Sequence, residues 1–562
     1  MRIASLSARA RRAVRLSAAA IVGTAAATVL AASGVPQAPA QTPGPARPAL
    51  VVIIVVDQMR ADYVDRFSGN WTGGFARLVS QGAWFRNAAY PYAETMTCAG
   101  HATIATGVFP HTHGIVQNEW PVGDRREEPS CVDDPASPDV GYLTPPTGGH
   151  SARQLLVPTF ADLMRAGGAH VAAVSLKADA AIALVGHGGD AVTWVNDRLD
   201  GLATSRAYTA LPVPAVTAFA QANPIETYFR RTWDRLLPLA GYADPDAGVG
   251  EAVPRGWSTS FPHVLNGGGR TPDVDFRAQW LRSPFVDEYI GRLAGSLVDS
   301  MRLGKGAGTD VLAVSLSATD EVGHIFGPRS QEIQDTLARL DRTLGSLFDR
   351  LDTSVGRNRY VVALTSDHGV TPIPEQARRE GRDAGRLDPA DIAGAVDARL
   401  AAVWGRGRYV AALAGSNMNL YFMPGVYDRL RGSPALVDDL VRIIQGMPGV
   451  YRVLKAEQVR DVPSAASADP VVRAVALSYY PGRSGDLLIV LKPGWNSTAY
   501  PSMHGSPWPD DQRVPLFMMG AGIKAGQYTQ AVTPADIAPT LAVLTGITMP
   551  KSEGRPLREA LN

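Results

Sequence analysis

The chain has 562 residues, of which 45% are hydrophobic and 19% are charged. This length is too great for one simple core, and the composition excludes wholesale disorder. The 54 basic residues nearly balance the 53 acidic ones, for a formal charge of +1. A chain so balanced lacks the overall positive field that holds a nucleic-acid backbone, so we expect no nucleic acid as a structural partner.

Residues 1–40 have the pattern of a secretory signal peptide. They hold five arginines and no acidic residue, then an Ala-rich apolar run and the sequence Ala38-Pro39-Ala40. Basic, apolar and small-x-small segments in this order are typical of a cleaved signal. The apolar run is short and weakly apolar for a membrane span, so we favour cleavage over an uncleaved anchor. Arg11-Arg12 leaves the choice between a Sec and a twin-arginine route open. Without this segment 49 basic residues face 53 acidic ones, and we expect a periplasmic or secreted protein with no membrane attachment.

Four apolar runs of strand length each lead to an ionisable residue. Unbroken runs of this kind predict strands buried on both faces, as in a parallel sheet. Helical patterns lie between them, for example Ser330–Leu351 with Ser330 as the N-cap. The alternation predicts an α/β fold with a doubly wound, mostly parallel sheet and helices on both faces, which binds ligands at the carboxyl ends of its strands. The runs are Leu50–Val56 before Asp57, His170–Leu176 before Lys177, Asp310–Leu316 before Asp320, and Tyr360–Ser366 before Asp367 and His368.

Two segments interrupt this alternation, which begins after a Pro-rich linker at 41–48. Residues 200–290 are rich in Pro, Gly and aromatic residues, which indicates an irregular cap. Residues 386–475 carry helix-like and strand-like stretches, which indicates a small α+β insertion. We therefore expect the core in three parts, at 49–199, 291–385 and 476–562.

Histidine and aspartate fragments fall where the predicted strands end. Asp320 and His324 are four residues apart, Asp367 and His368 are adjacent, and Asp57 ends the first run. His504 lies in a loop rich in Gly, Trp and Pro. Each fragment alone is common as a surface pair or a helix cap. Together at one edge of a sheet they match the imidazole and carboxylate ligands of zinc.

These residues carry a resemblance to the alkaline phosphatase superfamily. Within it, the chain is most similar to the phosphate-irrepressible alkaline phosphatases, which are monomeric periplasmic enzymes with a threonine nucleophile. The resemblance covers most of residues 49–560, in order. The motifs are Val55-Val56-Asp57, Thr97-Cys-Ala-Gly-His101, His113-Gly-Ile, Asn118, Leu176-Lys177, Asp320-x3-His324, Ser366-Asp367-His368-Gly369, Pro481-Gly-Arg-Ser-Gly-Asp486 and His504-Gly-Ser.

The resemblance implies two Zn²⁺ ions, which would clamp the attacking and leaving oxygens of an in-line displacement. It places one ion on Asp320, His324 and His504. It places the other on Asp57, Asp367 and His368, with Thr97 beside it. Thr97 would be the nucleophile, at the N-cap of a helix where free N–H groups favour an anion, and it would form a phosphothreonine.

The resemblance also implies that Asn118 and Lys177 bind the phosphoryl oxygens. The family usually has arginine two positions after this lysine, but this chain has Asp179. On an extended strand, Lys177 and Asp179 would share a face and could pair, which would remove positive charge from the site. Alternatively Asp179 points away and another arginine substitutes, with Arg153, Arg329 and Arg483 as candidates.

Cys98 and Cys131 are the two cysteines, and an exported location favours their pairing as a disulfide. A pair would tether the loop that carries Asn118 to the nucleophile helix. Sulfatases of this superfamily use a modified Cys or Ser followed by Pro two residues on and Arg four residues on. Gly100 and Ala102 occupy those positions here, which argues against a sulfatase.

The leading hypothesis is an exported, zinc-dependent alkaline phosphatase that hydrolyses phosphate monoesters of small molecules through a phosphothreonine, as a monomer. The alternative is a phosphodiesterase of the nucleotide pyrophosphatase type, which Asp179 favours and Lys177 opposes. A third hypothesis, from another class, is a catalytically silent module that binds metal or phosphate.

Overall fold

The computed structural model describes residues 47–124, 127–415, 418–460, 467–497, 500–549 and 551–562. The predicted signal segment and all but the last two residues of the predicted linker lie outside these ranges. No helix in the described residues combines the length and the apolarity that crossing a membrane requires.

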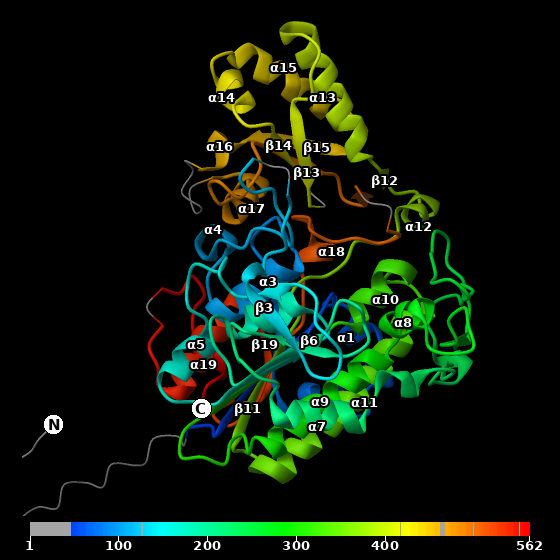
Figure 1. Cartoon of the computed structure of the whole chain (residues 1–562), viewed down its shortest axis with the longest axis vertical. Coiled ribbons are helices and arrows are strands. Elements are labelled where there is room, and N and C mark those ends of the chain that lie inside the picture. Colours follow the sequence, from blue (N-terminus) through cyan, green and yellow to red (C-terminus); the bar gives the residue numbers. More distant parts are fainter. Residues whose placement is uncertain (1–46, 125–126, 416–417, 461–466, 498–499, 550) are drawn as a thin grey trace, which may run out of the picture. The chain divides into compact units, whose positions relative to one another are not determined.

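Eleven strands of the described residues form one mixed sheet, in the order β19-β2-β18-β11-β1-β10-β5-β6-β7-β3-β4 (Figure 1). Its centre is parallel and consists of β11 (Tyr360–Thr365), β1 (Leu50–Val56), β10 (Asp310–Leu316), β5 (Val171–Ser175) and β6 (Ala191–Val195). Antiparallel pairs flank this centre on both sides. The predicted doubly wound α/β fold is confirmed, with antiparallel strands added at the edges. The outer strands are β18 (Leu516–Gly520), β2 (Ala83–Ala88), β19 (Gly526–Val532), β7 (Leu202–Ser205), β3 (Asp133–Gly141) and β4 (Gly149–His150).

Strand β1 shows why the central strands are apolar throughout. Its seven residues are all buried, and alternate side chains enter two different hydrophobic clusters. Val52 and Ile54 belong to the first cluster, and Val51 and Ile53 belong to the second. Successive side chains of a strand point to opposite faces, so a sheet covered on both faces needs an unbroken apolar run.

Helices contribute to both clusters, so they cover both faces of the sheet (Figure 1). The longest helix, α11 (Gln331–Leu351), begins after Ser330. The Ser330 side chain accepts a hydrogen bond from the N–H of Ile333, which confirms Ser330 as the N-cap. The first cluster takes residues of α2 (Gly74–Gln81), α7 (Pro214–Ala222), α8 (Val274–Leu281), α9 (Phe285–Ser300), α10 (Ala318–Phe326) and α11 (Gln331–Leu351). The second takes residues of α3 (Thr97–Thr106), α5 (Phe160–Ala166), α6 (Ala178–Val185) and α19 (Ile537–Thr545).

The two interrupting segments differ in regularity. Residues 200–290 contain α7 and α8, which pack on the core, and the short strands β8 (Thr232–Trp233) and β9 (His263–Val264). The other segment has its own hydrophobic cluster around a four-stranded sheet, β13-β14-β16-β15. Its strand β16 lies beyond residue 475. Its elements are α13 (Pro389–Trp404), β13 (Val410–Ala414), β14 (Asn419–Phe422), α14 (Val426–Arg431), α15 (Pro434–Gln445), β15 (Val450–Lys455) and β16 (Leu487–Leu491).

A buried acid links this smaller sheet to the nucleophile segment. Glu94 is 7% exposed, and its Oε1 accepts a 2.9 Å hydrogen bond from Asn419 at the start of β14. Burial raises the pKa of Glu94 from 4.5 to about 8. Between these values the folded chain keeps a proton that the unfolded chain has released, so rising pH lowers the free energy of unfolding.

We expect Glu94→Gln to remove this pH dependence while keeping an acceptor for Asn419. From pH 4.5 to 8, the wild type should lose stability relative to the variant by up to about 1.4 kcal/mol per pH unit. Urea unfolding of both proteins across this range measures the difference. Glu226→Gln, at an exposed glutamate, is the control and should follow the wild type. A constant offset between wild type and Glu94→Gln at every pH would contradict the assignment.

Candidate active site

Three aspartates and a lysine gather at the carboxyl ends of four neighbouring parallel strands. Asp57 follows β1, Asp367 lies two residues after β11, Lys177 lies two residues after β5, and Asp320 lies in the first turn of α10, just after β10. The strand order β11-β1-β10-β5 makes them neighbours. Lys177 Nζ donates to Asp57 Oδ2 at 2.8 Å and to Asp320 Oδ2 at 2.5 Å. The predicted edge of the sheet is therefore an acidic cluster with one ammonium group against it.

Three histidines surround the aspartates, and each has its Nδ1 against a backbone carbonyl. His324 Nδ1 lies 2.9 Å from Ser502 O, His368 Nδ1 lies 3.0 Å from Gly369 O, and His504 Nδ1 lies 2.9 Å from Thr95 O. A carbonyl oxygen only accepts, so Nδ1 carries the proton in all three rings. Each neutral ring then has its lone pair on Nε2, which is the arrangement of a histidine that binds a metal.

These Nε2 atoms face the carboxylates. His324 Nε2 lies 3.1 Å from Asp320 Oδ1, and His368 Nε2 lies 3.4 Å from both Asp57 Oδ1 and Asp367 Oδ2. Asp57 Oδ1 and Asp367 Oδ2 are buried and have no hydrogen-bond partner. An imidazole lone pair and a carboxylate oxygen repel each other unless a cation or a proton lies between them.

Burial sets the protonation of the cluster. It raises the pKa of Asp57, and the charges of Asp320 and Asp367 raise it further. Burial lowers the pKa of His504 and of His368, which keeps both rings neutral. Burial acts against the charge on Asp320, but His324 and Lys177 outweigh it and hold the pKa of Asp320 well below its usual range. Burial also opposes the charge on His324, but Asp320 outweighs it and raises the pKa of this ring above its usual value. A metal ion binds the neutral form of each imidazole, so it would displace a proton from His324.

The residues present fit a pair of metal ions. Two sets of side chains bring their ligand atoms within 4.8 Å of one another, and His368 belongs to both. Nitrogen and oxygen donors of this kind suit zinc. The sequence analysis assigned His368 to one ion and His324 to the other, and both rings lie at the cluster. The two sets are Asp320, His368 and His504, and Asp57, Asp367 and His368.

Thr97 reaches the cluster from α3. It is the first residue of the helix, and Met96 is the N-cap, so the predicted N-cap position of Thr97 is wrong by one residue. Its Oγ1 lies 3.3 Å from His368 Nε2. Gly100 permits this approach, because a Cβ at that position would overlap the carbonyl oxygen of Asp367. His101 ends the motif that Thr97 begins, and its Nδ1 lies 2.9 Å from Thr97 O and 3.3 Å from Asp367 Oδ2.

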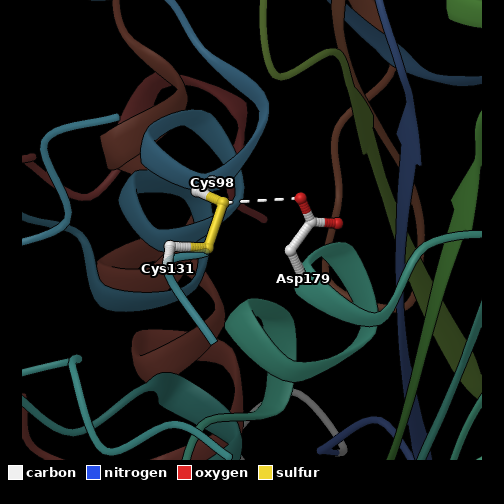
Figure 2. Close-up of side chains that lie close together, drawn as sticks. All are labelled: Cys98, Cys131 and Asp179. Carbon is white, nitrogen blue, oxygen red and sulfur yellow. Dashed lines mark hydrogen bonds between the residues drawn. A yellow bond between two sulfur atoms is a disulfide. The ribbon is translucent and has the colours of Figure 1, made fainter. Parts of the chain in front are cut away.

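Asn118 lies beside Thr97 with a fixed orientation. Its Oδ1 accepts the N–H of Cys98 at 2.9 Å, so its amide N–H₂ is directed away from that bond. A disulfide joins Cys98 to Cys131 (Figure 2). The N–H of Cys131 donates to Asn118 O at 2.7 Å. The helix start and the Asn118 loop are therefore tied together by covalent and hydrogen bonds.

A cavity of about 210 Å³ is lined by Thr97 and by three of the predicted metal ligands, Asp320, His324 and His504. At about 30 Å³ per water molecule, it has room for a small anionic group. Lys177 and Asn118 line it, as expected for residues that contact a substrate. It is also lined by four residues that the sequence analysis did not assign to the site. Arg282 comes from the cap and Tyr500 and Met503 from a loop, while Glu321 lies on α10 within the Asp320-x3-His324 motif.

Gln58 was missed as well. Its Nε2 donates to Asp320 Oδ1 at 2.5 Å and its backbone N–H donates to Asp367 Oδ1 at 3.1 Å, so it bridges the two metal sets. Its position directly after Asp57 is the signal that could have found it.

Of the two alternatives left open for Asp179, the structure agrees with the one in which Asp179 points away from Lys177. The chain turns into α6 immediately after Lys177, which is its N-cap, so the two residues do not share the face of a strand. Lys177 contacts Asp57 and Asp320 instead. The Asp179 carboxylate lies against the disulfide, with Oδ2 3.4 Å from Cys98 Sγ (Figure 2). It lines a separate cavity of about 490 Å³, which shares Lys177 and Glu321 with the first.

The three arginines considered as substitutes are engaged elsewhere. Arg153 pairs with Asp134 and Arg329 with Glu380, while Arg483 donates to the carbonyls of Gly114 and Gln154. None of the three lines either cavity in the described part of the chain.

Comparison with known proteins agrees with this site. Residues 51–515 match the family Type I phosphodiesterase / nucleotide pyrophosphatase. The chain belongs to this family. Alkaline phosphatase PhoV of Synechococcus elongatus is 31% identical to this chain over 92% of this chain and 93% of PhoV. Alkaline phosphatase PafA of Elizabethkingia meningoseptica is 32% identical over 92% of this chain and 95% of PafA.

The family fold extends over the whole core. The crystal structure of PafA superposes with a TM-score of 0.81, at 29% identity, over 92% of this chain and 99% of that one. A second solved structure, with a TM-score of 0.83, is a PafA variant substituted at a threonine, an asparagine, a lysine and an arginine. The threonine and asparagine are 21 positions apart, and the lysine and arginine are two apart.

Proposed function

We propose that this member of the alkaline phosphatases is an exported, zinc-dependent phosphomonoesterase that acts as a monomer through a phosphothreonine at Thr97. Its substrates are phosphate monoesters of small molecules. The observation that carries the proposal is the position of Thr97 Oγ1, 3.3 Å from His368 Nε2 and beside two buried sets of metal ligands.

The metal ligands are the residues described above: Asp57, Asp320, His324, Asp367, His368 and His504. When bound, two zinc ions offset the charge on the attacking and leaving oxygens of an in-line displacement. Thr97 lies next to these ligands, where a metal lowers the pKa of a hydroxyl.

The chain's own groups then carry out a double displacement. Thr97 Oγ1 forms a bond to phosphorus while the bond from phosphorus to the leaving oxygen breaks. Asn118 and Lys177 donate hydrogen bonds to the phosphoryl oxygens. The free N–H groups at the start of α3 favour the same negative charge. Water then breaks the bond between Oγ1 and phosphorus, which releases phosphate and restores the hydroxyl.

The PafA variant supports these assignments. Its threonine–asparagine spacing of 21 equals that of Thr97 and Asn118, and its lysine–arginine spacing of two equals that of Lys177 and Asp179. The same comparison marks Asp179 as the departure of this chain from PafA.

The second candidate function is a phosphodiesterase. The observation in its favour is the cavity of about 490 Å³ beside Lys177, where Asp179 stands. A second ester group of a diester would have room there. The Lys177 ammonium, which lines both cavities, favours a dianion and therefore a monoester.

Kinetics with two matched substrates test the choice. On zinc-loaded protein we expect kcat/KM for p-nitrophenyl phosphate to exceed that for its methyl diester by at least about 10²-fold. Chelation of the metal should abolish both activities, and zinc should restore them. A preference for the diester would establish the second candidate. Turnover of neither substrate by the zinc-loaded protein would indicate a silent metal-binding module.

A further inference from the structure

We propose that Arg282, from the cap, is a specificity-determining residue that binds the phosphoryl group of a monoester in place of the arginine that Asp179 replaces. The inference rests on the proposed function, because it concerns the same cavity. Arg282 lines that cavity together with Thr97, Asn118 and Lys177.

The backbone on both sides of Arg282 is anchored. It follows α8 directly as the C-cap residue, and the preceding Trp280 is fully buried in the core cluster of the sheet. The following Ser283 is also fully buried, and its hydroxyl donates to Trp280 O at 2.7 Å. Arg282 itself is half-buried. Because the backbone is fixed at the rim of the cavity, only the long side chain can change position there. The guanidinium group lies at the end of that side chain.

The guanidinium is available to a ligand. In the described part of the chain its hydrogen bonding is limited to a 3.5 Å contact with Ala278 O on its own helix, and no carboxylate lies within ion-pair distance. This differs from Arg153, Arg329 and Arg483, which are held by carboxylates or carbonyls. The acid that interacts with Arg282 electrostatically is Glu321, which lines the same cavity.

The contribution of Arg282 is directional hydrogen bonding more than net charge. Glu321 offsets its positive charge within the cavity. The planar guanidinium, however, presents several N–H donors in a fork that matches two oxygens of a phosphoryl group, which a lysine ammonium does not do. A monoester has three terminal oxygens at phosphorus and a diester has two, so a fork that binds the additional oxygen favours the monoester.

Arg282→Ala should therefore weaken monoester hydrolysis selectively. We expect kcat/KM for p-nitrophenyl phosphate to fall about 10- to 100-fold. The inhibition constant of inorganic phosphate should rise by about tenfold or more. The kcat/KM for the methyl diester should change by less than about threefold. Arg282→Lys keeps the positive charge but loses the forked donors of the guanidinium. Its kcat/KM for p-nitrophenyl phosphate should lie between those of the alanine variant and the wild type.

Arg277→Ala is the matched control, because Arg277 lies on the same helix and lines neither cavity. It should leave all three quantities unchanged. Zinc content and thermal unfolding of Arg282→Ala should equal those of the wild type, which separates a lost contact from lost structure.

An equal loss on monoester and diester, or no loss on either, would overturn the role of Arg282 while leaving the phosphatase intact. A wild type that hydrolyses neither substrate would instead defeat the proposed function. The two failures are therefore distinct.

Discussion

Thr97→Ala is expected to lower kcat for p-nitrophenyl phosphate by at least about 10³-fold. The variant removes the Oγ1 that lies 3.3 Å from His368 Nε2 and leaves every proposed metal ligand other than Thr97 in place. Zinc content should therefore stay at the wild-type value, because the imidazoles and carboxylates of the cluster do not depend on the hydroxyl. Steady-state kinetics and plasma mass spectrometry on the same sample check both statements.

Two further variants make this result specific to the hydroxyl. Thr97→Ser keeps a nucleophile and should retain measurable turnover, with the phosphoryl group found on residue 97 after acid quenching. Thr106→Ala, at the other end of α3, should keep its activity. Near-normal turnover by Thr97→Ala would rule out the phosphothreonine.

The second large effect is expected from His368→Ala. His368 has one lone pair for a metal, on Nε2, which lies 3.4 Å from Asp57 Oδ1 and from Asp367 Oδ2, so its loss removes a donor from the set that it forms with these aspartates. We expect zinc affinity to fall by more than about 10²-fold, with activity falling in parallel at limiting zinc. Competition with a chelator of known affinity measures the zinc affinity, and kcat/KM at fixed free zinc measures the loss of activity.

His170→Ala is the control for a general effect of losing a histidine, since the His170 side chain is 67% exposed at the opposite end of β5. It should bind zinc as the wild type does. If His368→Ala kept its full zinc content and its activity, the two-metal assignment would be wrong.

Much of this fold could be predicted because its signals are local. The run Leu50–Val56 is apolar throughout, since a central strand is covered on both faces. Ser330 marks the start of its helix because a hydroxyl can satisfy a free N–H there. The proposed ligands Asp57 and Asp367 lie within two residues of the ends of β1 and β11, so their common edge follows from the parallel arrangement alone.

The surroundings of the phosphoryl group were harder to predict. The Lys177–Asp179 spacing suggested a pair only on the assumption that the strand continues, and the chain turns into α6 instead. The helix rotates the Asp179 side chain toward Cys98 and leaves Lys177 to Asp57 and Asp320. The point at which the strand ends and the helix begins thus decides which charges meet.

The order of the strands and of the ionisable residues after them determined by itself an α/β fold with a charged edge, and the nearly neutral composition indicated that this charge is local. The resemblance of the motifs to a known family added the enzymatic function. Only the tertiary structure decided which charges complete the site. Arg282 reaches the cavity from a cap helix more than 100 residues from Lys177 in the chain. No periodicity or spacing encodes such a contact, because packing of the cap on the core brings it about. Strand ends are set by short stretches of sequence, whereas the position of a cap side chain depends on the whole fold.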